Sequence, residues 1–133
     1  MTSFSAGSLE KLGECDERLQ ILFNEVVKFF DCTIICGHRG QEDQHKAFVE
    51  GNSKLDWPNG EHNSSPSKAV DVMPCYPDGI RWKDEHGMYF FAGFVKATAQ
   101  RLGIKIRWGG DWDGDNDTKD QTFNDPDHFE VVD

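Results

Sequence analysis

The sequence lacks an excess of positive charge. Lysine and arginine total 14 against 24 aspartates and glutamates in 133 residues, for a formal net charge of −10. Phosphate backbones and anionic membrane surfaces repel such a chain, so we expect no nucleic-acid partner. The acid excess is local, because residues 111–133 hold nine acidic residues and one lysine. A concentration of this kind indicates a site.

Long hydrophobic runs are also absent. No apolar stretch approaches the ~18 residues that span a bilayer, and residues 1–18 show no basic region followed by an apolar one. We therefore expect no membrane insertion, and a soluble protein made in the cytoplasm without a signal peptide.

The cysteines form no CxxC pair. Cys15, Cys32 and Cys36 lie within apolar stretches, where a small hydrophobic residue would serve as well. We interpret them as reduced core residues, with a disulfide or a soft-metal site as the alternative.

The chain does contain enough apolar material for one core. Hydrophobic residues make up 37% and aromatic residues 12%, which predicts one domain over residues 1–133 that folds alone, as a monomer.

Apolar spacing predicts three helices and four strands. The helices are expected at 9–30, with Ser8 as its cap, at 41–50 and at 89–102; the strands at 32–36, 69–73, 104–108 and 128–132. This order predicts an α+β domain, a small antiparallel sheet packed against two long helices. The long loops at 51–68 and 109–127 are candidates for functional segments.

Three residues suited to a hard or borderline metal stand at strand ends or in a loop beside a strand: His62, Asp71 and His128. Two histidines and one carboxylate leave a fourth tetrahedral position for water, as in hydrolytic zinc sites. From the residues alone, ordinary histidines and a locally hydrogen-bonded Asp71 remain the alternative.

The context of these residues resembles the LAS group of zinc peptidases of the M15 family. That group includes phage and bacterial L-alanyl-D-glutamate peptidases and D-alanyl-D-alanine carboxypeptidases, and its pattern reads SxHxxGxAxD, with an acid, two residues and HFE much later. The matching segments are His62, Ser67–Asp71 and Asp125–Glu130, with Ile35–Arg39, Gln44 and Gly51–Lys54 upstream. The resemblance implies a LAS/hedgehog-like peptidase fold.

The match departs from the pattern near His62. His62 and Asp71 stand nine positions apart, two more than in the pattern, and Gly60 replaces its first serine. Because the insertion lies in a loop, we expect it to bulge outward and leave His62 in place. His38 or His45 is the alternative ligand.

The resemblance assigns roles to the matched residues. It implies that His62, Asp71 and His128 bind Zn²⁺, that Asp125 is the general base, and that Arg39 binds the scissile carbonyl oxygen.

Three more residues are expected near these, as supports of a ligand or as substrate contacts: Glu130, Gln44 and Trp108. Strand alternation places Glu130 on the His128 face, where it can hydrogen-bond that ligand. Alternation also predicts that Asp127 turns away from His128, which favours Asp125 over Asp127 as the base.

The acidic segment carries carboxylates at every second position, at Asp111, Asp113, Asp115 and Asp117. It is not an EF-hand loop, because positions 6 and 12 hold Asn116 and Thr122. Some phage members of the resembled family carry a calcium-responsive acidic loop here, so a Ca²⁺ site and a solvated turn both remain open.

These features predict a zinc-dependent peptidase that cleaves the stem peptides of bacterial peptidoglycan, of the L-alanyl-D-glutamate endopeptidase type. It would act as a phage endolysin or a virion-associated hydrolase, reaching the wall after membrane opening or from a phage particle. The alternatives are a D-Ala-D-Ala carboxypeptidase or dipeptidase, and a non-catalytic zinc-binding or wall-binding module. Asp125 and Arg39 argue against the module, because a structural metal needs neither.

Overall fold

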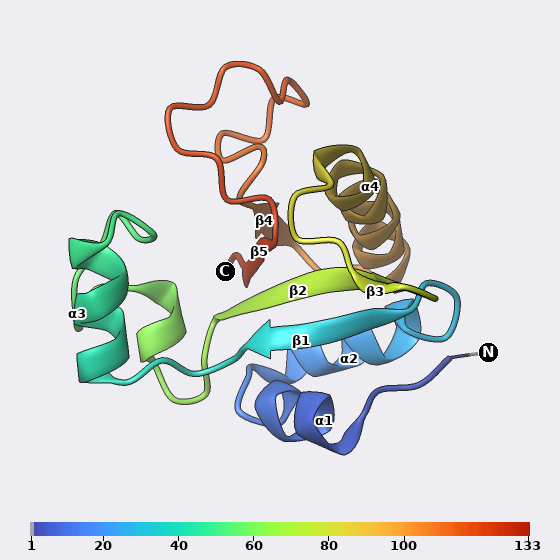
Figure 1. Ribbon diagram of the computed structural model, residues 1–133, viewed down its shortest axis with the longest axis horizontal. Helices are drawn as coiled ribbons and strands as arrows, with labels where there is room; N and C mark the ends of the chain where they lie inside the picture. Colours follow the sequence, from blue (N-terminus) through green and yellow to red (C-terminus); the bar gives the residue numbers. More distant parts are fainter. Residues whose placement is uncertain (1) are drawn as a thin grey trace.

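The computed structural model describes residues 2–133, which form a mixed α/β fold around a five-stranded antiparallel sheet (Figure 1). The helices are α1 (Ala6–Leu12), α2 (Glu17–Val26), α3 (Gln41–Val49) and α4 (Glu85–Leu102), with a 3₁₀ turn η1 (Glu61–Asn63). The strands are β1 (Cys32–Cys36), β2 (Ala69–Tyr76), β3 (Gly79–Ile80), β4 (Ile106–Trp108) and β5 (His128–Val131). The order across the sheet is β1-β2-β5-β4, with β3 paired to the far end of β2. The predicted fold class is confirmed.

The helix predicted at 9–30 is wrong in its continuity, because the chain forms two helices there. Gly13 ends α1 and the side chain of Asp16 caps α2. The break allows the Asp16 N–H to donate to the Ser67 carbonyl at 2.8 Å, a contact between distant segments that local spacing does not reveal. The cap of α1 is Ser5, and Ser8 is instead buried.

Two other boundaries differ from the prediction. Strand β2 continues through Pro74, and α4 begins at Glu85, one turn earlier than expected, with Asp84 as its cap. Gly103 ends α4 in the left-handed conformation at φ 72°, as its position after the apolar pattern predicts.

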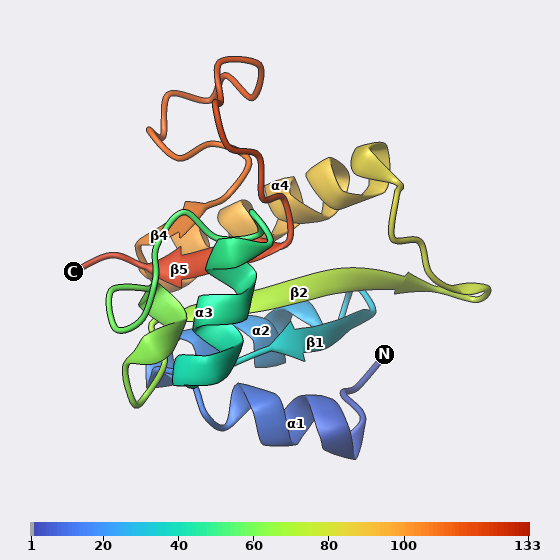
Figure 2. The ribbon, with the colours of Figure 1, turned by 60° about the vertical axis from the view of Figure 1, so that its left-hand side comes forward.

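The core lies between the sheet and the helices α2 and α4, which pack on one face of it, while α3 stands on the other side (Figure 2). Phe129 of β5 is fully buried, with its ring 5.4 Å from that of Phe23 on α2 and 6.2 Å from that of Phe91 on α4. Phe129 thereby fixes which face of β5 points into the core.

The register of β2 and β5 sets the opposite face. Asp71 pairs with His128, and Val70 pairs with Phe129. Because successive side chains of a strand point to opposite faces, Val70 and Phe129 enter the core while Asp71 and His128 lie side by side on the face away from α2 and α4. The sheet thus presents two polar residues at one point.

All four cysteines are free. Cys15 and Cys32 are buried, and burial raises the pKa of the Cys15 thiol to about 12. Cys36 and Cys75 are half-buried. Cys36 is therefore not the buried core residue that the sequence predicts. Within residues 2–133, no helix is long and apolar enough to cross a membrane.

Candidate active site

Three side chains that the sequence analysis singled out meet on the open face of the sheet. Nε2 of His62 lies 3.2 Å from Oδ1 of Asp71, and Nδ1 of His128 lies 3.3 Å from the same oxygen. The two nitrogens are 3.3 Å apart. All three residues are buried, and their facing atoms form a nearly equilateral triangle.

The outer nitrogen of each histidine contacts an oxygen acceptor. Nδ1 of His62 lies 2.7 Å from the Gly37 carbonyl oxygen, and Nε2 of His128 lies 2.8 Å from Oε1 of Glu130. A carbonyl oxygen and a carboxylate only accept, so in its neutral form each histidine carries its single proton on that outer nitrogen. The inner nitrogens then direct lone pairs at Asp71, whose Oδ1 has no hydrogen-bond donor.

Three converging lone pairs repel one another unless a cation lies among them. A tetrahedral zinc ion bound at about 2.0–2.1 Å requires ligand atoms that are about 3.3 Å apart, which is the size of this triangle. The donor set of two imidazoles and one carboxylate also suits zinc. The residues present therefore fit a metal ion of this class, bound by His62, Asp71 and His128.

The pKa shifts of the three groups indicate that positive charge is favoured at this site. Burial disfavours charged His62, but the adjacent Asp71 carboxylate outweighs it and raises the pKa of His62 to about 10. Burial likewise opposes protonation of His128, yet Asp71 and Glu130 raise its pKa to about 9. Burial alone would raise the pKa of Asp71, but the two imidazoles hold it well below its usual range.

Asp125 stands beside the triangle and outside it. Its Oδ2 lies 3.8 Å from Nδ1 of His128, and burial raises the pKa of the Asp125 carboxyl. A carboxyl group this close to Asp71 and His128 can act as a general base or share a cation with them. Asp125 and His128 come close to each other although they are three positions apart, because residues 125–127 form a turn that enters β5. The His128 N–H donates to the Asp125 carbonyl at 3.1 Å in this turn.

Asp127, which strand alternation was expected to turn away from His128, lies in the turn directly before β5. Its half-buried carboxyl group interacts with that of Asp125, and burial together with the charges of Asp71 and Asp125 raises the pKa of Asp127 to about 8. Because Asp127 precedes β5 and belongs to the turn, strand alternation does not set the direction of its side chain. Asp127 does not line the cleft, whereas Asp125 does.

A polar network holds Arg39 at the mouth of β1. The guanidinium donates to Oε1 of Gln44 at 3.1 Å and lies 3.4 Å from Oδ2 of Asp71. Gln44 is 1% exposed and also accepts from Asn63 Nδ2 at 3.0 Å. Asn63 donates in addition to the Arg39 carbonyl at 3.0 Å. Gln44 is therefore a support for Arg39, one of the two roles expected for it.

The segment around His62 follows the expectation for its insertion. His62, Asn63 and Ser67 are buried, while residues 64–66 between them are exposed. The carbonyl of His62 accepts from the Arg39 N–H at 2.8 Å, which ties η1 to the end of β1. The alternative ligands lie elsewhere, since His45 is exposed and bonded to Asp56 at 2.9 Å, and His38 is not part of the triangle.

The two tryptophans near the site have different positions. Trp108 is 5% exposed, does not line the cleft, and donates through Nε1 to the Pro126 carbonyl at 2.7 Å. It supports the turn between Asp125 and His128, and a substrate contact is ruled out by its burial. Trp112 does line the cleft, and its ring lies 5.2 Å from that of His128.

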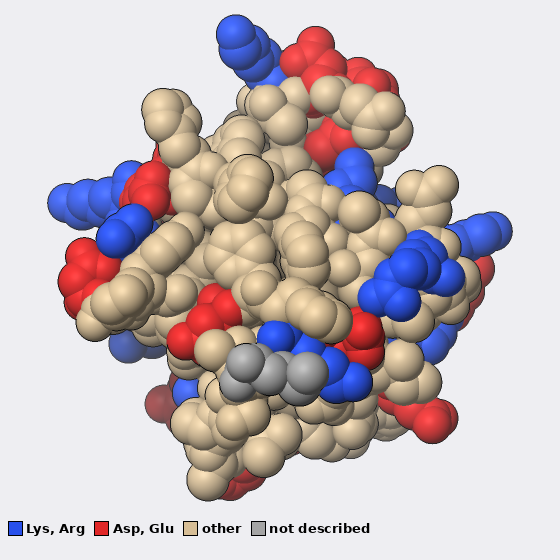
Figure 3. All heavy atoms as spheres, turned by 90° about the vertical axis from the view of Figure 1, so that its right-hand side faces the viewer, with Lys and Arg blue, Asp and Glu red and all other residues tan. Residues whose placement is uncertain are grey.

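The acidic segment brings together three of its four alternating carboxylates. Asp111, Asp113 and Asp115 place oxygens within 4.8 Å of one another, whereas Asp117 accepts from the Lys119 N–H at 2.9 Å and is not in that group. Asp111 is 3% exposed, and its Oδ1 has no hydrogen-bond partner. In Figure 3 acidic atoms crowd at the top of the molecule, where Figure 1 places this loop.

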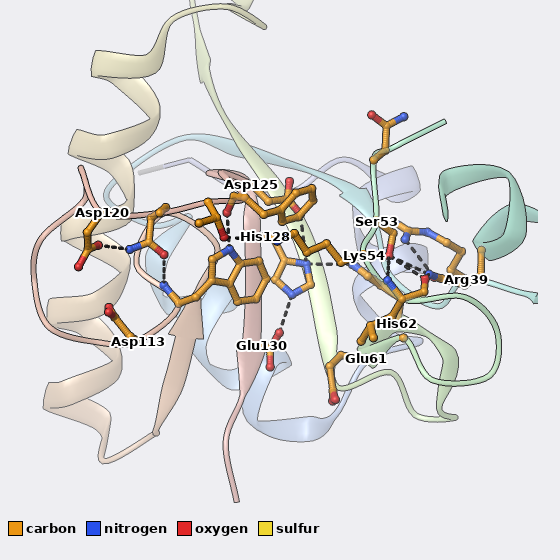
Figure 4. A pocket seen from close by; sticks show the side chains of 18 residues that line it. Arg39, Ser53, Lys54, Glu61, His62, Asp113, Asp120, Asp125, His128 and Glu130 are labelled. Carbon is orange, nitrogen blue, oxygen red and sulfur yellow. Dashed lines mark hydrogen bonds and ion pairs between the residues drawn. The ribbon is translucent and has the colours of Figure 1, made fainter. Parts of the chain in front are cut away.

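A cleft of about 430 Å³ runs between the segments 52–62 and 112–123, and the two histidines of the triangle, His62 and His128, line it together with Asp125. Figure 4 shows Arg39, Ser53 and Lys54 on one side, Asp113 and Asp120 on the other, and Asp125 and His128 between them. The sequence did not predict that Ser53, Asn63 and the Gly37 carbonyl form hydrogen bonds with residues of the site. Their only signal was their closeness in sequence to matched residues.

The fold and the site define a class. Two histidines and an aspartate that converge beside a second acidic residue and an arginine, at a cleft, form the arrangement of a metal-dependent hydrolase.

Comparison with known proteins narrows this class to one family. Residues 1–132 match the phage L-alanyl-D-glutamate peptidase family, and the chain belongs to it. It is 25% identical over 134 residues to the L-alanyl-D-glutamate peptidase of Escherichia phage T5, covering 97% of both chains. Among solved structures, the Serratia marcescens L-Ala D-Glu endopeptidase ChiX superposes with a TM-score of 0.77 at 23% identity, over 98% of this chain and 90% of that one. This likeness confirms the fold.

Proposed function

We propose that the protein is a zinc-dependent peptidase that hydrolyses the L-alanyl-D-glutamate bond in the stem peptides of bacterial peptidoglycan. The observation that carries the proposal is the triangle of His62, Asp71 and His128 with Asp125 beside it, on a chain of this peptidase family. The chain spans almost the whole length of the phage T5 peptidase, whose name states this bond.

A zinc ion held by the three ligands would polarise the scissile carbonyl group and lower the pKa of an attacking water. Asp125 would accept a proton from that water, because its carboxylate lies beside the triangle, 3.8 Å from Nδ1 of His128, and lines the cleft. The same carboxyl group then donates the proton to the leaving amine of the D-glutamyl residue.

Arg39 donates hydrogen bonds to the carbonyl oxygen as negative charge develops on it. Gln44 and Asn63 hold the guanidinium and the backbone of Arg39 in place, so no reorganisation is needed during the reaction. All of these groups come from one chain, which supports a monomer as the active form.

The test is mass spectrometry of purified peptidoglycan after digestion, with and without a chelator. The expected products carry a new N-terminal D-glutamyl residue, and the chelator abolishes them. Release of terminal D-alanine would instead indicate a carboxypeptidase or dipeptidase. No cleavage by zinc-loaded protein would favour a non-catalytic module.

The acidic segment is proposed to bind a regulatory Ca²⁺ ion through Asp111, Asp113 and Asp115. The support is the buried Asp111 oxygen without a partner, at a point where two other carboxylates converge. Carboxylate oxygens are the ligands that Ca²⁺ prefers. Asp117, which the sequence suggested as a fourth ligand, is left out because it does not converge with the other three.

The route to the wall follows from the substrate. We propose that the protein reaches peptidoglycan after the cell membrane is opened or from a phage particle, because its relative is a peptidase of a phage, Escherichia phage T5.

A further inference from the structure

Two positively charged side chains line the cleft, Arg39 and Lys54, and they differ in whether a carboxylate of the protein lies next to them. Arg39 lies against Asp71 and Gln44, within the machinery already described. Among residues 2–133, no carboxylate lies within 4.0 Å of the ammonium group of Lys54, although the chain carries a net charge of −10. Lys54 is the cleft cation that remains available to a ligand.

Lys54 reaches across the cleft. Its Nζ lies 3.4 Å from Oγ1 of Thr122 and 5.6 Å from the centroid of the Phe123 ring, both on the opposite wall. A hydroxyl group and an aromatic face leave the charge of an ammonium group without a counter-ion. A ligand carboxylate in the cleft would supply it.

The backbone that carries Lys54 is tied to the catalytic arginine. Gln44 accepts from Arg39 through Oε1, and through Nε2 it donates to Ser53 Oγ at 3.0 Å and to the Leu55 carbonyl. Ser53 Oγ in turn accepts from the Leu55 N–H at 3.2 Å. Residues 53–55 and Arg39 therefore share one buried anchor, which sets the two cations of the cleft relative to each other.

The proposed substrate has a free carboxylate close to the bond that is cut. A glutamyl residue has two carboxyl groups, and only one of them can continue the peptide. The other is ionised at neutral pH and lies on the leaving side of the L-alanyl-D-glutamate bond. The acidic wall with Asp113 and Asp120 repels this charge, so the favourable orientation turns it toward Lys54 (Figure 4).

We propose that Lys54 is a specificity-determining residue, whose ammonium group binds the free carboxylate of the D-glutamyl residue. The inference rests on the proposed function, because it names the part of that substrate which this wall of the cleft recognises.

The test uses two synthetic stem peptides that differ only at this position, one with D-glutamate and one with the free carboxyl group converted to the carboxamide. Both are given to the zinc-loaded protein and to its Lys54→Met, Lys54→Arg and Lys46→Met variants. Lys46 is exposed on α3 and does not line the cleft, so Lys46→Met is the matched loss of a lysine charge.

The parent should cleave the acid about 10-fold or more faster than the amide in kcat/KM, as the loss of a hydrogen bond between charged groups implies. Lys54→Met should lower kcat/KM for the acid to the level of the amide and leave the amide unchanged. Lys54→Arg should retain part of the preference, and Lys46→Met all of it. The preference should weaken at higher salt, because the cleft is open to solvent.

Binding of both peptides, measured by calorimetry, separates this inference from the proposed activity. Equal cleavage and equal binding of acid and amide by the parent would overturn the role of Lys54 and leave the activity standing. A preference that survives in Lys54→Met would also overturn it. If the parent cleaves neither peptide but binds the acid more tightly through Lys54, the activity fails and the recognition stands.

Discussion

Glu130 holds His128 from the side opposite to Asp71, with 2.8 Å between Oε1 of the carboxylate and Nε2 of the imidazole. Its other oxygen, Oε2, lies 3.3 Å from Nη1 of Arg107 on the neighbouring strand. Glu130 is 5% exposed, and each of its two carboxylate oxygens has a partner. A carboxylate in this position fixes the ring orientation and the tautomer of a metal ligand.

Removal of this carboxylate should weaken metal binding. Glu130→Ala is expected to lower zinc affinity about 10- to 100-fold, the usual cost of losing such a partner, while Glu130→Gln keeps an acceptor and should lose less. Competition with a chromogenic chelator measures the affinity. An unchanged affinity in Glu130→Ala would show that the ring is oriented by its packing alone.

The ligand set itself is open to a direct test. Elemental mass spectrometry should find about one zinc per chain in the parent and in His45→Ala, as a single three-ligand site implies, and far less in His62→Ala. His45 is a fair control because it is exposed and bonded to Asp56. One tightly held equivalent in His62→Ala would contradict the triangle.

Asp125 should matter for the reaction and not for the metal. Asp125→Ala is expected to keep its zinc and its melting temperature while cleavage of wall peptides falls about 10²- to 10⁴-fold, the usual contribution of general acid–base catalysis. Asp127→Ala should cost much less, because Asp127 does not line the cleft. Cleavage by Asp125→Ala at the parent rate would overturn the mechanism.

Gly109 holds the turn that carries Asp125. Its N–H donates to the His128 carbonyl at 2.8 Å, its carbonyl accepts from the Asp125 N–H at 2.9 Å, and an added Cβ would lie 2.0 Å from the Asp125 carbonyl oxygen. Gly109→Ala should therefore lower the free energy of unfolding by about 1–3 kcal/mol through overpacking, and cleavage should fall with it.

Gly93 on α4 provides the matched control. It is exposed, and nothing lies within 4 Å of an added Cβ. Gly93→Ala should raise the free energy of unfolding by about 0.5–1 kcal/mol, because alanine is the better helix former. Denaturant unfolding of both variants measures the difference, and equal stabilities would contradict the close packing at Gly109.

Calcium should act through Asp111, Asp113 and Asp115. Millimolar Ca²⁺ is expected to raise the melting temperature of the parent, because a cation relieves repulsion among the three carboxylates. Asp113→Asn combined with Asp115→Asn should remove the response, whereas Asp117→Asn should keep it. A parent that does not respond to Ca²⁺ would leave a solvated acidic turn.

The sequence predicted best where local pattern and tertiary packing agree. The apolar spacing before Gly103 predicts α4, and the alternation of His128, Phe129 and Glu130 predicts the two faces of β5. The core buries Phe91, Ala92, Val95 and Ala99 of α4, and Phe129 and Val131 of β5. The three residues of the triangle were also visible in sequence, because the pattern around them resembles that of a family, and the structure brings them together.

Other features depended on contacts between distant segments. The break between α1 and α2 follows from the pairing of Asp16 with Ser67. Strand β2 passes through Pro74 because β5 pairs only with Ala69–Asp71, so no ladder donor is needed on that side of Pro74.

The sequence by itself therefore determined the fold class, the order of most elements and the residue types of the site. Only the tertiary structure decided which nitrogen of each histidine faces Asp71, because the Gly37 carbonyl and Glu130 select it from outside the triangle. It also decided that burial and the charges of Asp71 and Asp125 raise the pKa of Asp127. These choices depend on hydrogen bonds between segments that meet only when the chain folds, and no local pattern encodes them.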